Sequence, residues 1–189
     1  IYRPLAAPVI NVSCGRDHLG VVLNNGYVYT WGQGTDLQLG HGEDRNYIHE
    51  PTRVTALENV KQVSCAQMFT AFVTQTGEVF MSGRFSAYEP FTLYRVNLPP
   101  VKSVSSGWDG NHIAAILTTQ ELYTWGDNDV GQLGHGDTEM SNVPTHVDTL
   151  INVTQVSCGA YHTAAIRDTG ELYTWGRLSP AADDEANWY

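Results

Sequence analysis

The four residues Val156-Ser157-Cys158-Gly159 decide the fold, because the same pattern occurs three more times along the chain. The earlier copies read Val12-Ser13-Cys14-Gly15, Val63-Ser64-Cys65-Ala66 and Val104-Ser105-Ser106-Gly107. The intervals between the four starts are 51, 41 and 52 residues. The 189 residues therefore contain four copies of one unit.

Two further motifs follow these starts. One reads Thr30-Trp31-Gly32, Met81-Ser82-Gly83, Thr124-Trp125-Gly126 and Thr174-Trp175-Gly176 in the successive units. The other is a glycine-rich segment at 37–42 and 131–136, which the shorter second unit lacks. We expect Gly40 and Gly134 to permit tight turns there, while Leu39 and Leu133 plug the space between neighbouring units.

Each unit reads as a series of short antiparallel strands. The runs 18–23, 69–74, 112–117 and 162–167 are apolar and short, as buried strands are. Turn residues follow them, and three of the four turns carry a glycine. No window of the chain has convincing helical spacing, so the sequence predicts an all-β protein.

The repeat also predicts how the chain is divided. We assign 12–62, 63–103 and 104–155 to three units, of which the second is short, and 156–178 to a partial fourth unit. Residues 1–11 look like the tail of a preceding unit or a closing strand, and 179–189 form an acidic tail outside the repeat. Strand-built units of this length imply propeller blades, because a single sheet cannot bury both of its faces alone.

In these motifs the chain resembles a known family, the regulator-of-chromosome-condensation repeat. The residues that carry the resemblance are Val-Ser-Cys-Gly-x-x-His at 156–162, Gly-Glu-Leu-Tyr-Thr-Trp-Gly at 170–176, Gly-Gln-Leu-Gly-His-Gly-Asp at 131–137 and Pro-Thr-x-Val at 144–147. The resemblance implies a β-propeller, commonly of seven blades, of which three and a half to four are present. The chain is then either a fragment of a larger propeller or a small closed ring.

Several residues are expected to have structural roles in the repeat. Trp31, Trp125 and Trp175 should occupy equivalent positions between adjacent sheets, and Ser82, their small counterpart, should mark the weakest packing. The remaining expected structural positions are the glycines that recur in the motifs: Gly15, Gly32, Gly83, Gly107, Gly126, Gly159 and Gly176.

Charge and cysteine content limit the classes of partner and compartment. The chain has 10 Lys and Arg against 20 Asp and Glu, for a formal net charge of -10. This charge argues against direct nucleic-acid binding, because each phosphate contact needs a cation. No stretch approaches the apolar length of a membrane span. Three cysteines favour a reducing compartment, cytoplasmic or nuclear.

Candidate chemical sites are weak. Cys14 and His18, like Cys158 and His162, have the spacing of zinc half-sites, but the other two units break the pattern with Phe69 and Ser106. The carboxylates of Asp127 and Asp129 are ligands that calcium accepts, yet a turn held by local side-chain bonds explains them better. We therefore expect no catalytic residue, metal or cofactor.

An exposed-looking tryptophan and several loop acids are candidates for binding a partner protein. Trp108 and Asp109 lie in a loop with two extra residues, where an aromatic side chain either anchors a partner or packs between blades. One Gly-Trp pair is too few for the tryptophan-based light sensing of the plant ultraviolet-sensing propellers that this motif also resembles. The acids Asp127, Asp129 and Asp137, together with Glu43 and Asp44, would form an acidic face that steers a basic partner.

The sequence thus favours a non-catalytic protein-interaction platform. The alternative is a guanine-nucleotide exchange factor for a Ran-like or other small GTPase, the activity that the resemblance implies from the family's founding member. No clear wedge insertion of the kind that this member uses is present. Repeats of this family also serve as modules of ligases and kinases. The third alternative is therefore a propeller domain carried on such an enzyme.

Overall fold

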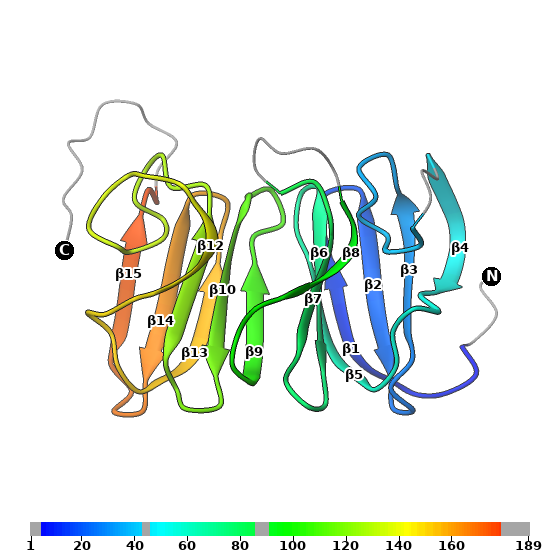
Figure 1. Cartoon of the computed structure of the whole chain (residues 1–189), viewed down its shortest axis with the longest axis horizontal. Helices are drawn as coiled ribbons and strands as arrows, with labels where there is room; N and C mark the ends of the chain where they lie inside the picture. The colour runs from blue at the N-terminus through cyan, green and yellow to red at the C-terminus, as the bar shows by residue number, and fades with distance from the viewer. Residues whose placement is uncertain (1–4, 43–45, 86–90, 179–189) are drawn as a thin grey trace.

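The computed structural model describes residues 5–42, 46–85 and 91–178, and all regular structure in these residues is β-strand (Figure 1). The strands form four antiparallel sheets, each a meander of neighbours in the sequence. The predicted all-β class and partial propeller are confirmed. Sheet 1 contains β1 (Val9–Cys14), β2 (His18–Leu23), β3 (Val28–Gln33) and β4 (Tyr47–Arg53).

The other sheets repeat this order. Sheet 2 contains β5 (Val60–Cys65), β6 (Phe69–Thr74), β7 (Val79–Gly83) and β8 (Phe91–Val96). Sheet 3 contains β9 (Val101–Ser106), β10 (His112–Leu117), β11 (Leu122–Gly126) and β12 (Ser141–His146). Sheet 4 has three described strands, β13 (Val153–Cys158), β14 (His162–Arg167) and β15 (Leu172–Gly176). The described part of the chain contains no helix of the length and apolarity that a membrane crossing requires.

The sheets begin three residues upstream of the unit boundaries that we read from the sequence. Val9, Val60, Val101 and Val153 open the first strands, whereas the repeated motif starts at positions 12, 63, 104 and 156. The motif therefore covers the second half of each first strand, which carries the serines that bind the next sheet. Residues 9–11 consequently lie in β1, and the predicted acidic tail at 179–189 lies outside the described residues.

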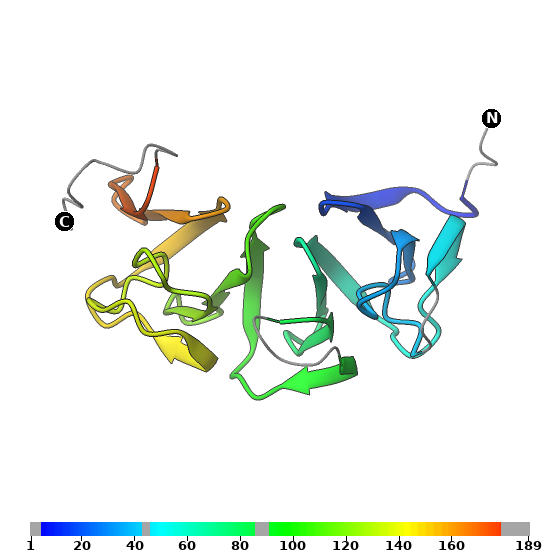
Figure 2. The same ribbon diagram turned by 90° about the horizontal axis from the view of Figure 1, so that it is seen from above.

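The four sheets fan out around a common axis as an arc (Figure 2). The innermost strands β1, β5, β9 and β13 follow one another along the inside of this arc, and each contacts the next. Sheets 2 and 3 are covered on both faces. Sheets 1 and 4 stand at the two ends of the arc, and each has one outward face.

Side chains of each inner strand bind the backbone of the next one. Asn11 Oδ1 accepts the N–H of Val63 at 2.8 Å, and Ser13 Oγ accepts the N–H of Cys65 at 2.9 Å. The same bonds recur from sheet 2 to sheet 3 and from sheet 3 to sheet 4, with the acceptors Gln62, Ser64 and Ser105 and the donors Val104, Ser106 and Cys158. These bonds fix the register between neighbouring sheets.

Hairpins at the opposite end of the strands make a second connection. Gly26 and Gly77 have φ values of 81° and 87°, and their carbonyl oxygens accept the N–H of the first residue of the next sheet at 2.9 Å. In sheet 3, Gln120 takes this place with a φ of 69° and accepts the N–H of Val153. Gln120 therefore holds a left-handed conformation that glycine adopts more easily.

Apolar clusters fill the three spaces between sheets. The largest lies between sheets 2 and 3 and includes Phe69, Met81, Ile113 and Trp125, of which Trp125 is 1% exposed. Smaller clusters lie between sheets 1 and 2 and between sheets 3 and 4. The core is therefore divided into layers between sheets rather than gathered at one centre.

Buried histidines cross two of these spaces. His18 Nε2 lies 2.7 Å from Thr70 Oγ1, and His112 Nε2 lies 2.9 Å from Thr163 Oγ1. In sheet 2 the equivalent residue is Phe69, which packs edge-on against Phe85. Both buried histidines thus lie against threonines of the next sheet, although only His18 belongs to a Cys-x3-His pair. Burial lowers the pKa of both His18 and His112 from 6.5 to about 4.

The tryptophans of the repeat occupy equivalent register positions. Trp31, Trp125 and Trp175 pair with Leu19, Ile113 and Thr163 on the neighbouring strands. Trp125 is buried, Trp175 is half-buried and donates from Nε1 to the carbonyl oxygen of Gln132 at 2.9 Å, and Trp31 is half-buried on the outward face of sheet 1.

The expectation that Ser82 marks the weakest packing is wrong. Ser82 is fully buried, and its hydroxyl donates to the carbonyl oxygen of Leu37 in the adjacent sheet at 2.7 Å. The small side chain lets the neighbouring loop approach closely, and the hydrogen bond satisfies the buried hydroxyl.

We predict that Trp125→Ala lowers the free energy of unfolding by about 3–5 kcal/mol, because it leaves a large cavity between two sheets. Urea denaturation measures this difference. Trp108→Ala, which truncates an exposed tryptophan, is the matched control and should cost less than about 1 kcal/mol. Equal losses of unfolding free energy for the two variants would contradict the packing of Trp125 between two sheets.

We also predict that the protein loses stability as the pH falls from about 6.5 to about 4. In this window the unfolded chain binds protons at His18 and His112 while the folded chain does not, so acid favours unfolding. Each histidine should contribute roughly 2 kcal/mol of loss between pH 7 and pH 5.

Urea denaturation at the two pH values tests this linkage. His18→Gln and His112→Gln remove the titrating group, so each variant should show a smaller difference between the two pH values than the unmodified chain. His49→Gln, at an exposed position of β4, should leave the difference unchanged. A pH dependence that persists in full in both buried-site variants would refute the linkage.

Candidate interaction surface

The two ends of the strands form two unlike rims (Figure 1). The loop rim is made by the segments after the first and third strands of each sheet. It comprises 15–17, 34–42, 66–68, 84–85, 107–111, 127–140, 159–161 and 177–178 of the described residues. The hairpin rim at the other end carries shorter connections. The predicted partner-binding residues that the structure describes all lie on the loop rim, and Glu43 and Asp44 lie outside the described residues.

A glycine at or next to the end of each third strand joins the two loops of its sheet. Gly32, Gly83, Gly126 and Gly176 all have positive φ, and a Cβ on any of them would lie within 2.5 Å of a carbonyl oxygen in the loop between the first two strands. The residue after each glycine donates its N–H to that same carbonyl at 2.7–3.1 Å, as Gln33 does to Asp17. Glycine is therefore required at this position, and the loop rim is pinned at four equivalent points.

The glycine-rich segments pack back onto their own sheets. Leu39 and Leu133 are buried, and their carbonyl oxygens accept the hydroxyls of Thr30 and Thr124 at 2.6 and 2.7 Å. Gly40 and Gly134 have positive φ, and the position of a Cβ on Gly134 would be 2.8 Å from Trp175 Nε1. His41 and His135 complete the arrangement beside the same threonines.

Asn128 holds the loop 127–140 in shape. Its buried amide donates to the carbonyl oxygens of Asp137 and Glu139 and to Asp137 Oδ1, each at 3.0 Å, while its Oδ1 accepts the N–H of Leu133 at 2.9 Å. Asp137 Oδ1 also accepts the N–H of Glu139. Asp137 consequently braces the loop through these bonds. Asp137 and Asp129 are both exposed, and Asp127 is partly buried.

No group of three or more His, Cys, Asp or Glu side chains in the described residues could hold a metal ion. The Asn128 bonds agree with the expected turn held by local side-chain contacts, although the amide rather than the two carboxylates makes them. Burial raises the pKa of the Cys65 and Cys158 thiols to about 12, and the three cysteines form no disulfide.

Trp108 projects from the inner part of the loop rim. The side chain is 60% exposed, so it does not pack between blades. Next to it, Asp109 Oδ1 accepts a hydrogen bond from Gln67 Nε2 at 3.2 Å and lies 3.9 Å from Arg16 Nη1. A Cβ on Gly107 would lie 1.9 Å from the carbonyl oxygen of Gly159, so this loop is pressed against the next sheet.

Gly15 and Gly159, on the inner part of the loop rim, also have no room for a side chain. A Cβ on Gly15 would lie 2.3 Å from the carbonyl oxygen of Ala66, and a Cβ on Gly159 would meet the His162 ring. Arg16, Gln67 and Asp109 follow Gly15, Ala66 and Gly107, which hold equivalent positions in three successive sheets. They therefore meet across sheet boundaries, which brings residues 93 positions apart in the sequence into one cluster.

A polar cavity of about 230 Å³ lies beside this cluster. It is lined by Arg16, Asp17, Gln33, Asp36, Gln38, Gln67 and Met68. Asp36 Oδ1 pairs with Arg84 Nε at 2.7 Å, which ties the loops of sheets 1 and 2 together. Asp36 and Arg84 were not among the predicted site residues, because nothing in their local pattern indicates that they are partners.

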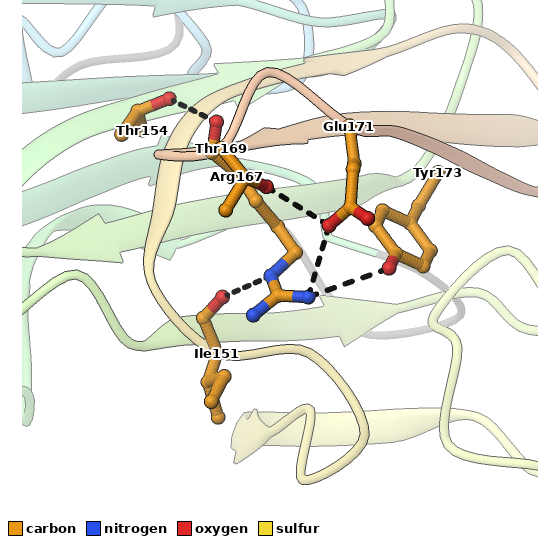
Figure 3. A network of polar contacts seen from close by, with 6 residues as sticks. All are labelled: Ile151, Thr154, Arg167, Thr169, Glu171 and Tyr173. Carbon is orange, nitrogen blue, oxygen red and sulfur yellow. Dashed lines mark hydrogen bonds and ion pairs between the residues drawn. The ribbon is translucent and has the colours of Figure 1, made fainter.

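The hairpin rim of sheet 4 is internally bonded (Figure 3). Arg167 donates from Nε to the carbonyl oxygen of Ile151 at 3.1 Å and from Nη1 to Glu171 Oε2 at 3.1 Å. Its Nη1 also reaches the hydroxyl of Tyr173 at 3.5 Å, and Thr169 donates to the same Glu171 oxygen. These polar groups are directed at one another, in contrast to the outward Trp108.

Comparison with known proteins relates the repeat to characterised families. Two models of the regulator of chromosome condensation (RCC1) repeat match the chain, one at 25–73 and 120–166 and the other at 9–38 and 101–132. The ultraviolet-B receptor UVR8 of Arabidopsis thaliana is 34% identical over 80% of this chain and 38% of its own length. The human E3 ubiquitin-protein ligase HERC2 is 32% identical over 82% of this chain and 4% of its own length.

Solved structures show the same fold. Yeast RCC1 (Prp20), crystallised with Kap60, superposes with a TM-score of 0.81 at 20% identity over 97% of this chain and 48% of that one. Human WBSCR16 gives 0.78 at 24% identity over 92% and 49%. The chain thus spans about half of these structures and less than half of the curated relatives. By its repeats and its relatives, the chain belongs to the RCC1 repeat family.

Proposed function

We propose that this chain is a protein-interaction platform whose loop rim binds a basic partner protein. The observation that carries the proposal is Trp108, a large aromatic side chain that is mostly exposed at the inner edge of the rim. Tryptophan is, with tyrosine and arginine, a residue type enriched among the side chains that anchor protein interfaces. The polar Asp109, Gln67 and Arg16 beside it supply groups that orient a bound segment.

The rigidity of the rim supports this role. Four glycine-dependent contacts pin the loops, and Asn128 and the Asp36–Arg84 pair brace the longest ones. A preformed surface loses little conformational entropy when a partner docks, so more of the contact energy appears as affinity.

The charge of the rim supports a basic partner. Among its described residues the acids are Asp17, Asp36, Asp109, Asp127, Asp129, Asp137 and Glu139, against Arg16, Arg84 and Arg177. An acidic surface attracts cationic partners over a distance set by the ionic strength. Yeast RCC1 (Prp20) is bound to Kap60 in one solved structure, and Prp20p of Saccharomyces cerevisiae binds Gsp1p and histones, which supports protein partners for this family.

We place this platform inside the cell, in the cytoplasm or nucleus, without a catalytic residue, metal or cofactor of its own. The free thiols of Cys14, Cys65 and Cys158 support a reducing compartment. Relatives named as ligases or kinases match this chain over a small share of their length, 17% for mouse Nek9. A repeat domain that binds partner proteins for a catalytic domain elsewhere in the same polypeptide would fit that pattern.

We predict that Trp108→Ala weakens binding of a fluorescent nine-residue oligoarginine peptide at least about tenfold. The reason is that the guanidinium groups lose the face of the indole ring. Fluorescence anisotropy measures the affinity. Tyr47→Ala is the matched control, since Tyr47 is an equally exposed aromatic residue on β4, and it should change the affinity less than about twofold.

Two variants that each remove one carboxylate test whether the loop rim binds the peptide. Asp129→Asn on the loop rim should weaken peptide binding at low salt, whereas Asp168→Asn on the hairpin rim should not. Identical affinities of the unmodified chain, Trp108→Ala and Asp129→Asn would remove the loop rim as the binding surface.

The alternative function is guanine-nucleotide exchange on a small GTPase, and we predict that the 189-residue chain does not accelerate it. Exchange requires contacts that favour a distorted, nucleotide-free partner over the bound state. The short loop 107–111 offers one exposed tryptophan rather than an extended wedge. Release of fluorescent GDP from Ran-like, Rab-like and Arf-like GTPases measures the activity. An acceleration of about tenfold or more that Asp129→Asn abolishes would make exchange the better description.

A further inference from the structure

The polar cavity on the loop rim lies between loops of sheets 1 and 2, and its walls offer hydrogen-bond acceptors. Gln33 Nε2 donates to Thr35 Oγ1 at 2.8 Å, and Gln67 Nε2 donates to Asp109 Oδ1 at 3.2 Å. Both glutamines line the cavity, and these bonds fix the orientation of their amide groups. Among the described residues neither amide oxygen has a donor, so both oxygens remain for a ligand.

The charges around the cavity leave one negative charge in excess. Asp36 Oδ1 lies 2.7 Å from Arg84 Nε, so this carboxylate is paired. Arg16 lies 3.6 Å from Asp17 Oδ2 and 3.9 Å from Asp109 Oδ1, so one cation is shared between two carboxylates. The Asp17 side chain is 56% exposed and lines the cavity, where an entering ligand can reach it. The cavity therefore favours a cationic ligand.

Gln38 is the most deeply buried of the lining residues, at 1% exposed. Its Oε1 accepts the N–H of Asp36 at 2.8 Å, whereas its Nε2 has no acceptor in the described part of the chain. A buried polar group without a partner is costly, so the cavity favours a polar occupant. Its volume of about 230 Å³ equals roughly seven water molecules at about 30 Å³ each, which is room for the head of a long side chain. Met68 supplies an apolar wall for the methylene stem.

This set of polar groups is specific to sheets 1 and 2. In sheet 3, Gln132 takes the place of Gln38 and its Oε1 accepts the N–H of Val130 at 3.0 Å, which repeats the bond to Asp36. The apolar Val130 thus replaces the acid, and in sheet 4 Ala160 stands where sheet 2 has a glutamine. The structure of the repeat therefore does not require the polar lining of the cavity.

We propose that this cavity receives an arginine side chain of the basic partner, and in naming that partner the proposal rests on the proposed function. A guanidinium group presents its N–H donors in one plane and is more weakly hydrated than an ammonium group, so it enters a cavity at a lower cost. Gln33, Gln67 and Asp17 offer it acceptors from two sheets. Because Gln67 also binds Asp109, which is next to Trp108, one short segment of the partner reaches both the cavity and the indole ring.

Titration of the ¹⁵N-labelled chain with N-acetylarginine amide tests the cavity with a single side chain. The side-chain amide resonances of Gln33 and Gln67 should shift saturably, with a dissociation constant of about 10 mM or tighter. N-acetylcitrulline amide has nearly the same shape without the charge, and N-acetyllysine amide has the charge without the plane. Each should bind at least about fivefold more weakly. Equal binding of either analogue overturns the assignment to a guanidinium group.

Substitutions at Gln33 test the acceptors without relying on a loss alone. Gln33→Leu removes one acceptor at unchanged net charge and should weaken binding of N-acetylarginine amide at least about fivefold. Gln33→Glu places a carboxylate in the cavity and should tighten binding about two- to tenfold, a gain that a misfolded chain does not imitate. Gln75→Leu and Gln75→Glu, at an exposed glutamine on the hairpin rim, are the matched controls and should change the affinity less than about twofold. Affinity that is independent of residue 33 overturns the proposal.

The oligoarginine peptide separates the failure of this proposal from the failure of the proposed function. Gln33→Leu and Trp108→Ala should each weaken peptide binding, because the peptide meets both the cavity and the indole ring. If peptide binding depends on Trp108 while N-acetylarginine amide does not bind, the cavity proposal fails and the platform remains. If N-acetylarginine amide binds in the cavity while peptide binding is independent of Trp108, the tryptophan anchor fails and the cavity proposal remains.

Discussion

The hydrogen bond from a side chain of one inner strand to the backbone N–H of the next is the contact on which the other features of this structure depend. Ser13, Ser64 and Ser105 all make it, and Asn11 and Gln62 add a second bond two residues earlier. Inner-strand N–H groups that point away from their own sheet would otherwise be buried without a partner, at a cost of about 1–3 kcal/mol each. Each sheet is thus completed by its neighbour, and the apolar clusters form only when that register is kept.

The same dependence produces the loop rim. Because adjacent inner strands lie so close, the loops after them touch, and glycine is needed at positions such as Gly107. The two extra residues that follow Gly107 have no room between the sheets, so Trp108 is directed outward. Arg16, Gln67 and Asp109 meet because they follow equivalent positions in the first loops of three successive sheets. The candidate interaction surface is therefore a consequence of the packing between sheets.

The periodicity of the sequence was sufficient to predict the fold class, the repeated strands and the equivalent positions of the tryptophans, because these follow from local pattern repeated at fixed distances. Features that depend on contacts between units could not be predicted in this way. The hydroxyl of Ser82 donates to the carbonyl oxygen of Leu37 in another sheet. Asp36 pairs with Arg84, which is 48 residues away in the sequence. Asp137 is a surface acid in the structure as in the sequence, but the bond from Asn128 to its carboxylate could not be predicted. Gln120 takes a glycine-like φ because its carbonyl must reach Val153.

The cluster around Trp108 is built from sheets 1, 2 and 3, which the inner-strand bonds hold in register. The loop rim that carries it is acidic, so attraction of a basic partner weakens as salt is added. The apolar burial between the sheets is not screened by salt in this way and gains from sulfate or phosphate. The contacts that hold the sheets together and the surface that meets a partner therefore respond differently to ionic strength.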